Sequence, residues 1–143
     1  NFVGFLQYKL RNPSPEMCLM MIDIDDFKHI NDTYGHLEGD RALTLTASAL
    51  KRACGPFPKR PFIARYGGDE FVILMDGGLK EAEALKKSID DCLGKTGIGT
   101  GSEVLTVSAG ISQYRNGCDA KSWIADADKK LYKHKHEKIT AAR

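Results

Sequence analysis

The sequence predicts one domain of the α/β (α+β) class, in which strands alternate with helices and an antiparallel hairpin lies in the middle. Three observations support this prediction. The length of 143 residues is that of one domain. Apolar runs typical of strands are separated by stretches with the periodicity of amphipathic helices. Two of the β-prone runs are joined through Gly67-Gly68, which is a strong hairpin signal.

Four segments are predicted as strands. Residues 17–24 (MCLMMIDI) form an almost unbroken apolar run that ends in acids, as expected for a strand buried on both faces. Residues 62–66 and 71–75 flank Gly67-Gly68, and this pair predicts a tight two-residue turn with positive φ. Residues 104–112 (VLTVSAGIS) are rich in β-branched side chains and predict the fourth strand.

Helices are predicted around these strands, where apolar residues recur at intervals of three and four. Asn12-Pro13, Gly55-Pro56 and Gly94 supply stop signals after three of them. Residues 94–101 are rich in glycine and form a connector. The predicted helices cover residues 2–10, 43–54, 82–93 and 120–131.

Charge and cysteine content exclude several classes of function. Lys and Arg number 21 against 19 Asp and Glu, so neither a nucleic-acid polymer nor direct membrane contact is expected. The longest apolar run, residues 18–22, is too short to span a membrane. The four cysteines form no CxxC pair, which favours a reducing cytoplasm over a zinc site or disulfide framework. Because the chain opens without methionine, we expect residues 1–143 to be a single domain excised from a larger protein. Other domains of that protein could anchor it to a membrane.

Acidic side chains gather at two places where a cation could hold them. Asp23 and Asp25 lie two residues apart at the end of a predicted strand, so they project to the same side. Crowded acids repel one another unless a cation joins them, and hard oxygen ligands suit Mg²⁺ or Mn²⁺. Asp69 and Glu70 follow a turn without side chains, which a bulky ligand can approach. A plainer interpretation stays open, in which one acid caps a helix and the hairpin tip is simply polar.

Four stretches together resemble the GGDEF domain, the family of diguanylate cyclases and their degenerate relatives. They are DIDDFKHINDTYGHLEGD (23–40), RYGGDEF (65–71), TVSAG (106–110) and ADKKLYKHK (127–135). The resemblance implies a central mixed five-stranded sheet flanked by helices, like the palm of nucleotide cyclases and polymerases. It also implies condensation of two GTP into cyclic di-GMP, a bacterial second messenger, with release of two pyrophosphates. Each of two facing domains would hold one GTP, so a homodimer is expected for catalysis.

The resemblance also implies roles for individual positions. Asp23, Asp69 and Glu70 correspond to the catalytic acids, and with the backbone carbonyl of Ile24 they would hold Mg²⁺ or Mn²⁺. Such cations lower the pKa of the ribose 3′-hydroxyl and neutralise charge on the α-phosphate and the leaving pyrophosphate. The implied substrate-binding positions are Asn31 and Asp40 for guanine, Lys28, Lys135 and the amides of Asp26 and Phe27 for the phosphates, and Gly67-Gly68 for close approach of the ligand.

Three departures from the family pattern bear on function. Residues 1–3 read Asn-Phe-Val where relatives often carry Asn-Arg-Arg. Ile139 stands where an arginine is expected, and the adjacent Lys138 is a candidate replacement that lacks the bidentate fork of arginine. The two ends of the RxxD product-inhibition motif are Pro58 and Pro61, so no feedback inhibition through that site is expected.

These observations favour an active diguanylate cyclase, because the acid set is intact. The alternative is a catalytically weak or inactive GGDEF module that binds GTP and regulates an attached domain. A third hypothesis, a dimerisation scaffold, predicts no nucleotide binding at all.

Overall fold

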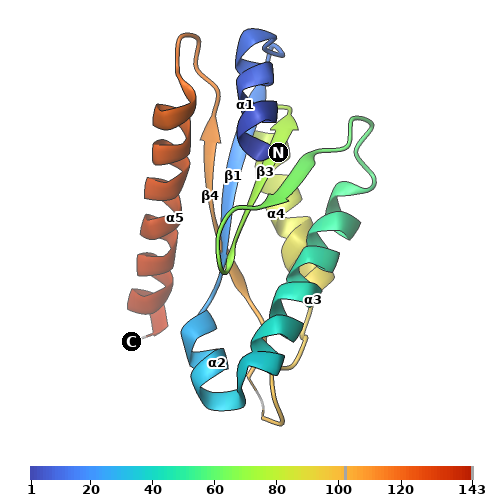
Figure 1. Cartoon of the computed structure of the whole chain (residues 1–143), viewed down its shortest axis with the longest axis vertical. Coiled ribbons are helices and arrows are strands. Elements are labelled where there is room, and N and C mark those ends of the chain that lie inside the picture. The colour runs from blue at the N-terminus through green and yellow to red at the C-terminus, as the bar shows by residue number, and fades with distance from the viewer. Residues whose placement is uncertain (102, 143) are drawn as a thin grey trace.

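The computed structural model describes residues 1–101 and 103–142. Five helices and four strands form this part of the chain (Figure 1). Their order is α1 (Phe2–Arg11), β1 (Met17–Ile24), α2 (Phe27–Tyr34), α3 (His36–Cys54), β2 (Phe62–Arg65), β3 (Glu70–Asp76), α4 (Leu79–Leu93), β4 (Val107–Gln113) and α5 (Ala120–Ala142). Within these residues, no helix combines the length and apolar character needed to cross a bilayer.

The predicted class is confirmed, but the sheet differs in detail from the expected one. It has four strands in the order β2-β3-β1-β4, where five were expected, and each pair is antiparallel rather than mixed. Before β4, an isolated bridge joins Gly97 to Val104, the one bridge there among the described residues, because a glycine-rich segment offers few side chains for cross-strand packing. At the other end, α5 continues to Ala142, since no Gly or Pro interrupts it.

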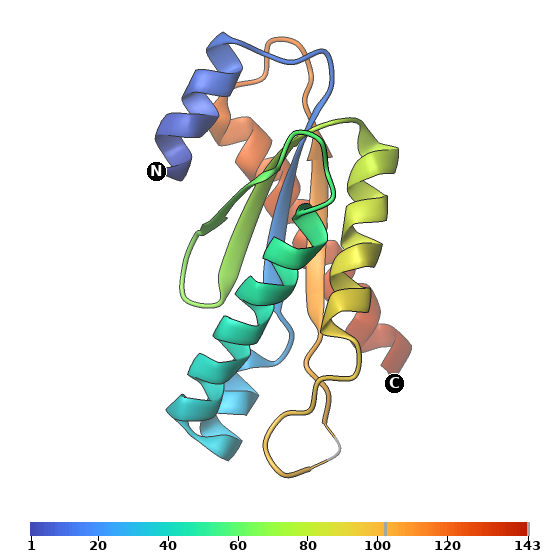
Figure 2. The ribbon, with the colours of Figure 1, turned by 90° about the vertical axis from the view of Figure 1, so that its right-hand side faces the viewer.

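Strand β1 is buried on both faces, as its apolar run predicts. Helices α3 and α4 cover one face of the sheet and lie side by side in Figure 2, whereas α1 and α5 cover the other. The β1 side chains in the core beneath α3 and α4 are Cys18, Met20, Ile22 and Ile24. Those beneath α1 and α5 are Met17, Leu19 and Met21. Because side chains alternate along a strand, Asp23 belongs to the face covered by α5.

The hairpin between β2 and β3 has a longer connection than predicted. The last paired residues are Arg65 and Phe71, and the N–H of Tyr66 donates to the carbonyl of Glu70 at 2.8 Å. Neither Gly67 nor Gly68 has a positive φ, so the prediction of a tight two-residue turn was wrong. A longer connection can reverse the chain direction with negative φ angles, so the two glycines do not need a positive φ.

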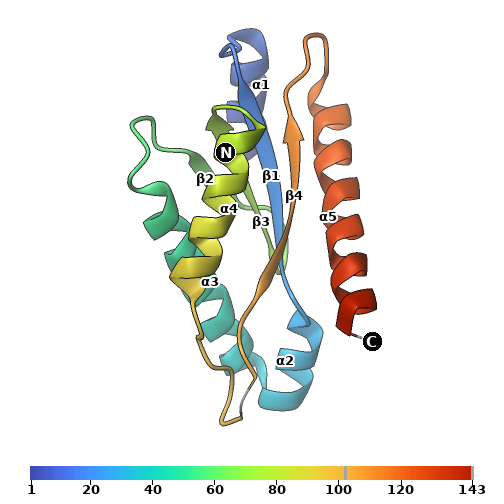
Figure 3. The ribbon, with the colours of Figure 1, turned by 180° about the vertical axis from the view of Figure 1, so that it is seen from behind.

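The region between β1 and β2 is more helical than the apolar periodicity predicts. Helix α2 buries only Ile30, and α3 begins at His36, seven residues before the predicted start at Leu43. Gly35, with φ of +93°, separates the two helices. The connection from α4 to β4 passes beside this corner (Figure 3), where the guanidinium of Arg41 donates to the carbonyl of Gly97 at 3.1 Å.

Candidate active site

Strand register brings the two predicted acid clusters together at one end of the sheet. Asp23 in β1 is paired with Glu70 in β3 and with Ser108 in β4. The N–H of Ile24 donates to the carbonyl of Asp69 at 3.3 Å. The side chain of Ile24 is fully buried, so only its backbone can face the acids. Residues 46 positions apart in the chain, 23 and 69, therefore meet at this edge.

The carboxyl groups of Asp23 and Asp69 are neighbours. Burial and the adjacent carboxyl group of Asp69 together raise the pKa of Asp23 to about 6, against the opposing effect of the Lys135 ammonium. Oδ2 of Asp23 accepts from Nζ of Lys135 at 2.5 Å, whereas Oδ1 is buried and has no partner among the described residues. A buried carboxylate oxygen without a partner is costly, and a cation would relieve that cost.

Glu70 adds a third carboxylate to this edge. Burial raises its pKa, and the negative charges of Asp23 and Asp128 act in the same direction. Within residues 1–101 and 103–142, no three acidic, histidine or cysteine side chains already converge as a metal cage. The oxygen donors present are nevertheless those that a small divalent cation prefers, and the unpartnered oxygen of Asp23 is available to it.

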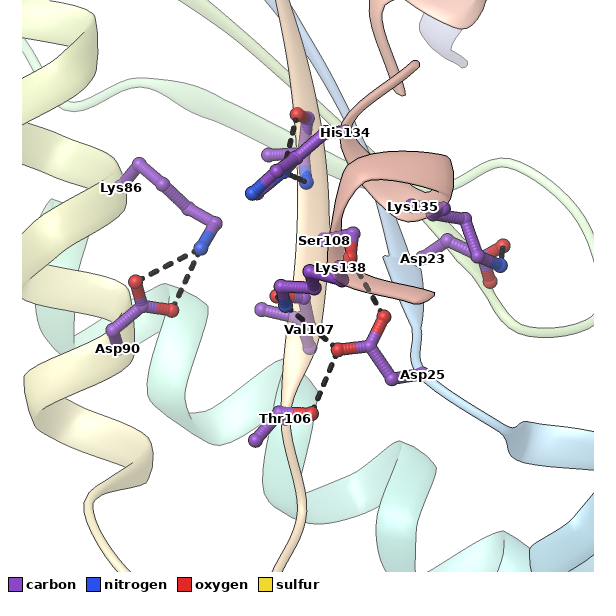
Figure 4. Close-up of polar contacts among 11 residues, drawn as sticks. Asp23, Asp25, Lys86, Asp90, Thr106, Val107, Ser108, His134, Lys135 and Lys138 are labelled. Atoms are coloured by element: carbon purple, nitrogen blue, oxygen red, sulfur yellow. Dashed lines mark hydrogen bonds and ion pairs between the residues drawn. The ribbon is translucent and has the colours of Figure 1, made fainter. Parts of the chain in front are cut away.

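Two lysines of α5 reach two acids at the end of β1 (Figure 4). Lys135 binds Asp23, and Nζ of Lys138 donates to Oδ2 of Asp25 at 2.8 Å. Lys138 also donates to the carbonyl of Val107 at 2.8 Å, so its ammonium group is committed within the fold. The candidate replacement for the missing arginine is therefore directed at Asp25. Ile139 is half exposed and lines an open cavity of about 260 Å³ at this point.

The turn from β1 to α2 forms another wall of that cavity, through Asp25 and Asp26. Asp26 has φ of +54°, a left-handed conformation, and it caps α2, which begins at Phe27. Backbone N–H groups in the first turn of a helix lack partners within the helix, which makes this end suitable for anions. Lys28 is exposed and donates to Asp32 at 2.7 Å, so its ammonium lies on the outer side of α2.

At the corner between α2 and α3, Asn31 lies against Gly39, the residue before Asp40. A Cβ built on Gly39 would lie 1.9 Å from Oδ1 of Asn31, so the amide rests directly on the glycine that precedes Asp40. The sequence-based interpretation had not identified Gly39. A glycine inside a helix costs about 1 kcal/mol of stability relative to alanine. A glycine at such a position therefore indicates that another group packs closely against the helix there.

With this geometry established, comparison with known proteins identifies the family. A profile described as "Diguanylate cyclase, GGDEF domain" matches residues 3–140. The chain belongs to the GGDEF family. Diguanylate cyclase A of Treponema denticola is 36% identical to this GGDEF chain over 126 residues, which are 83% of the chain and 32% of the relative. Diguanylate cyclase DgcM of Escherichia coli K12 is 35% identical over 127 residues, 85% of the chain and 29% of the relative.

Solved GGDEF structures share the fold. The GGDEF domain of DgcB from Caulobacter crescentus, in complex with c-di-GMP, matches with a TM-score of 0.83 and 28% identity, over 95% of this chain and 83% of that one. Diguanylate cyclase SiaD from Pseudomonas aeruginosa, in complex with its activator SiaC, matches with a TM-score of 0.84 and 27% identity, over 95% of this chain and 54% of that one. The chain spans about a third or less of the first curated relatives. GGDEF domains use GTP, and the family implies a divalent metal requirement.

Proposed function

We propose that this domain is a diguanylate cyclase that condenses two GTP molecules into cyclic di-GMP and two pyrophosphates. The observation that carries the proposal is the meeting of Asp23 and Asp69 at the end of the sheet, where one buried oxygen of Asp23 has no partner in the part of the chain that the structure describes. Such an oxygen next to a second carboxylate favours a divalent cation over a purely structural role.

The acid edge would hold Mg²⁺ or Mn²⁺ through Asp23, Asp69, Glu70 and the carbonyl of Ile24. When bound, such a cation lowers the pKa of a ribose 3′-hydroxyl and neutralises charge on the α-phosphate and the leaving pyrophosphate. Asp69 favours removal of the hydroxyl proton. Lys135, already in the cluster, supplies a positive charge for the phosphates, and the lack of side chains at Gly67-Gly68 lets the substrate approach the hairpin.

The phosphate end of GTP is held at the β1–α2 turn, and the guanine end is held at the junction between α2 and α3. The amides of Asp26 and Phe27, at the start of α2, suit the β- and γ-phosphates, with Lys28 close by on the same helix. Asp40 accepts hydrogen bonds from the N1–H and N2–H₂ donors of guanine, and the amide of Asn31 can both donate and accept. Adenine presents the opposite pattern at its six position, so this pair favours GTP.

Two copies are needed because each domain holds only one GTP. We therefore propose a homodimer for catalysis, formed by GGDEF domains (residues 1–143) of a larger protein, with the domain itself in the cytoplasm. Pro58 and Pro61 cannot form an ionic pocket, so we expect no feedback inhibition through that site.

A second function is favoured by one observation. Ile139 lines the cavity where an arginine is expected, and Lys138 is bound to Asp25 instead of facing a ligand. A weakened phosphate contact is consistent with a GGDEF module that binds GTP without efficient turnover and regulates an attached domain.

Turnover by a dimerised protein separates these functions. The domain, fused to a dimerising segment and supplied with GTP and Mg²⁺, should form cyclic di-GMP, detected by chromatography. Asp69→Asn should abolish product, whereas Asp91→Asn on the exposed side of α4 should leave it unchanged. Full activity of Asp69→Asn would refute the mechanism. Tight GTP binding without product in the forced dimer would decide for the regulatory module.

A further inference from the structure

Asp25, two residues after Asp23, has a very different environment. Its Oδ1 accepts from the hydroxyl of Ser108 at 2.7 Å, and its Oδ2 accepts from the hydroxyl of Thr106 at 2.7 Å and from Lys138 at 2.8 Å (Figure 4). Its side chain is 17% exposed. Both carboxylate oxygens are therefore engaged, in contrast to Oδ1 of Asp23.

These contacts join three segments at one residue. The backbone N–H of Asp25 donates to the carbonyl of Thr106 at 3.0 Å, which adds a main-chain bond to the two hydroxyl contacts from the same segment. Lys138 connects this point to α5 and, through the carbonyl of Val107, to β4. The end of β1 is thus tied both to β4 and to α5 immediately before the chain turns into α2.

The next residue, Asp26, is the only non-glycine residue with positive φ among the described residues. Such a conformation persists where the surrounding structure imposes it. A left-handed residue at the start of a helix turns successive N–H groups toward a common point, which is the arrangement of an anion-binding nest. The carbonyl of Asp26 accepts from the N–H of Ile30 at 3.0 Å and so begins α2.

We propose that Asp25 is a positioning residue that holds the β1–α2 turn in its anion-binding conformation, and that it is not a metal ligand. Both of its oxygens already accept hydrogen bonds, from Ser108, Thr106 and Lys138, so a cation would have to compete with these contacts. Lys138 acts as the counter-ion of Asp25. That the turn binds phosphate rests on the proposed function. That Asp25 holds the conformation of the turn does not.

The test compares the two acids by three measurements. Asp25→Asn and Asp23→Asn are titrated with Mn²⁺ in the absence of nucleotide and then with GTP and with inorganic tripolyphosphate. Amide hydrogen exchange is followed at Ile30, whose N–H donates to the carbonyl of Asp26 in the turn. Lys138→Met and Thr106→Val each remove one side-chain contact to Asp25. They replace Asp25→Asn in the same measurements if that variant fails to fold.

Asp25→Asn should keep its Mn²⁺ affinity within about twofold and lose about tenfold in affinity for GTP and tripolyphosphate, the effect of weakening a charge-assisted hydrogen bond. Exchange at Ile30 should accelerate while β1 stays protected, and Lys138→Met should act in the same direction. Asp23→Asn should instead lose Mn²⁺ binding.

Loss of Mn²⁺ affinity in Asp25→Asn equal to that in Asp23→Asn would overturn the proposal by making Asp25 a ligand. Unchanged exchange at Ile30 would overturn it as well. If the wild-type protein bound no GTP, the proposed function would fail, but the exchange measurement would still decide whether Asp25 holds the turn.

Discussion

The ammonium nitrogen of Lys135 lies 2.5 Å from Oδ2 of Asp23, across the interface between α5 and the end of β1. This contact places a positive charge within the acid edge that Asp69 and Glu70 complete. It also shows how the domain balances these buried charges, since a carboxylate removed from water needs a partner. The balance is partial because Oδ1 of Asp23 has none among the described residues.

We expect the metal-free domain to lose stability as pH rises through the titration of Asp23. Its pKa is raised from 3.8 to about 6 by burial and by Asp69, so the folded protein holds this proton more tightly than the unfolded chain. Stability conferred by that proton is present below the unfolded pKa and is lost as pH rises to about 6. The Tm of Asp23→Asn minus that of the wild type, measured in EDTA, should therefore increase over this range and then stay constant. A difference that falls with rising pH would contradict the prediction.

Gly39→Ala should weaken GTP binding without unfolding the domain. The added Cβ would lie 1.9 Å from Oδ1 of Asn31, so this amide would have to move away from the position that we propose for reading guanine. We expect a loss of about tenfold in GTP affinity, as for one hydrogen bond to a buried group, and an unchanged or higher Tm because alanine favours helices. Gly4→Ala in α1 is the matched control, since its Cβ would meet only ordinary contacts at 3.7 Å. Equal GTP affinity in both variants would argue against a role for Asn31.

Ile139→Arg should tighten GTP binding. The side chain is half exposed on α5 and lines the cavity beside Asp26 and Lys135, so an arginine there could add a forked contact to phosphate. We expect a gain of about tenfold in affinity, in proportion to one charge-assisted hydrogen bond. Tyr132→Arg adds the same charge at an exposed position of α5 and should have little effect at moderate salt. A similar gain in both variants would indicate a general charge effect.

Product inhibition should be absent in the dimerised protein. Pro58 and Pro61 occupy the positions of the charged pair, and proline side chains cannot bind phosphate or guanine by ionic contacts. Initial rates should stay constant in micromolar cyclic di-GMP. Pro58→Arg combined with Pro61→Asp should introduce inhibition. Strong non-competitive inhibition of the unaltered domain would show that another site binds the product.

Much of the architecture follows from local patterns. The apolar run of β1 predicts a strand buried on both faces, and the spacing of apolar residues predicts α4 and most of α3. Helix α2 was not predicted by apolar periodicity, because Ile30 is its only buried residue and its helical state depends on contacts with α3. The expected fifth strand came from the family pattern and not from any β-prone run in this chain.

By itself, the sequence determined which acids are present, where β1 ends, and which family the motifs indicate. Only the tertiary structure decided that, within the described part of the chain, Oδ1 of Asp23 has no partner while both oxygens of Asp25 accept hydrogen bonds. The residues that distinguish the two acids, Lys135, Lys138, Thr106 and Ser108, lie more than 80 positions away in the sequence. Two aspartates two residues apart at the end of a strand are equivalent in a linear pattern. They become different when α5 lies so close to β4 that a Cβ at Gly110 would meet the carbonyl oxygen of Ala127 at 2.1 Å. That close approach brings one lysine of α5 to each acid, and among the described residues it leaves Oδ1 of Asp23 without a hydrogen-bond partner.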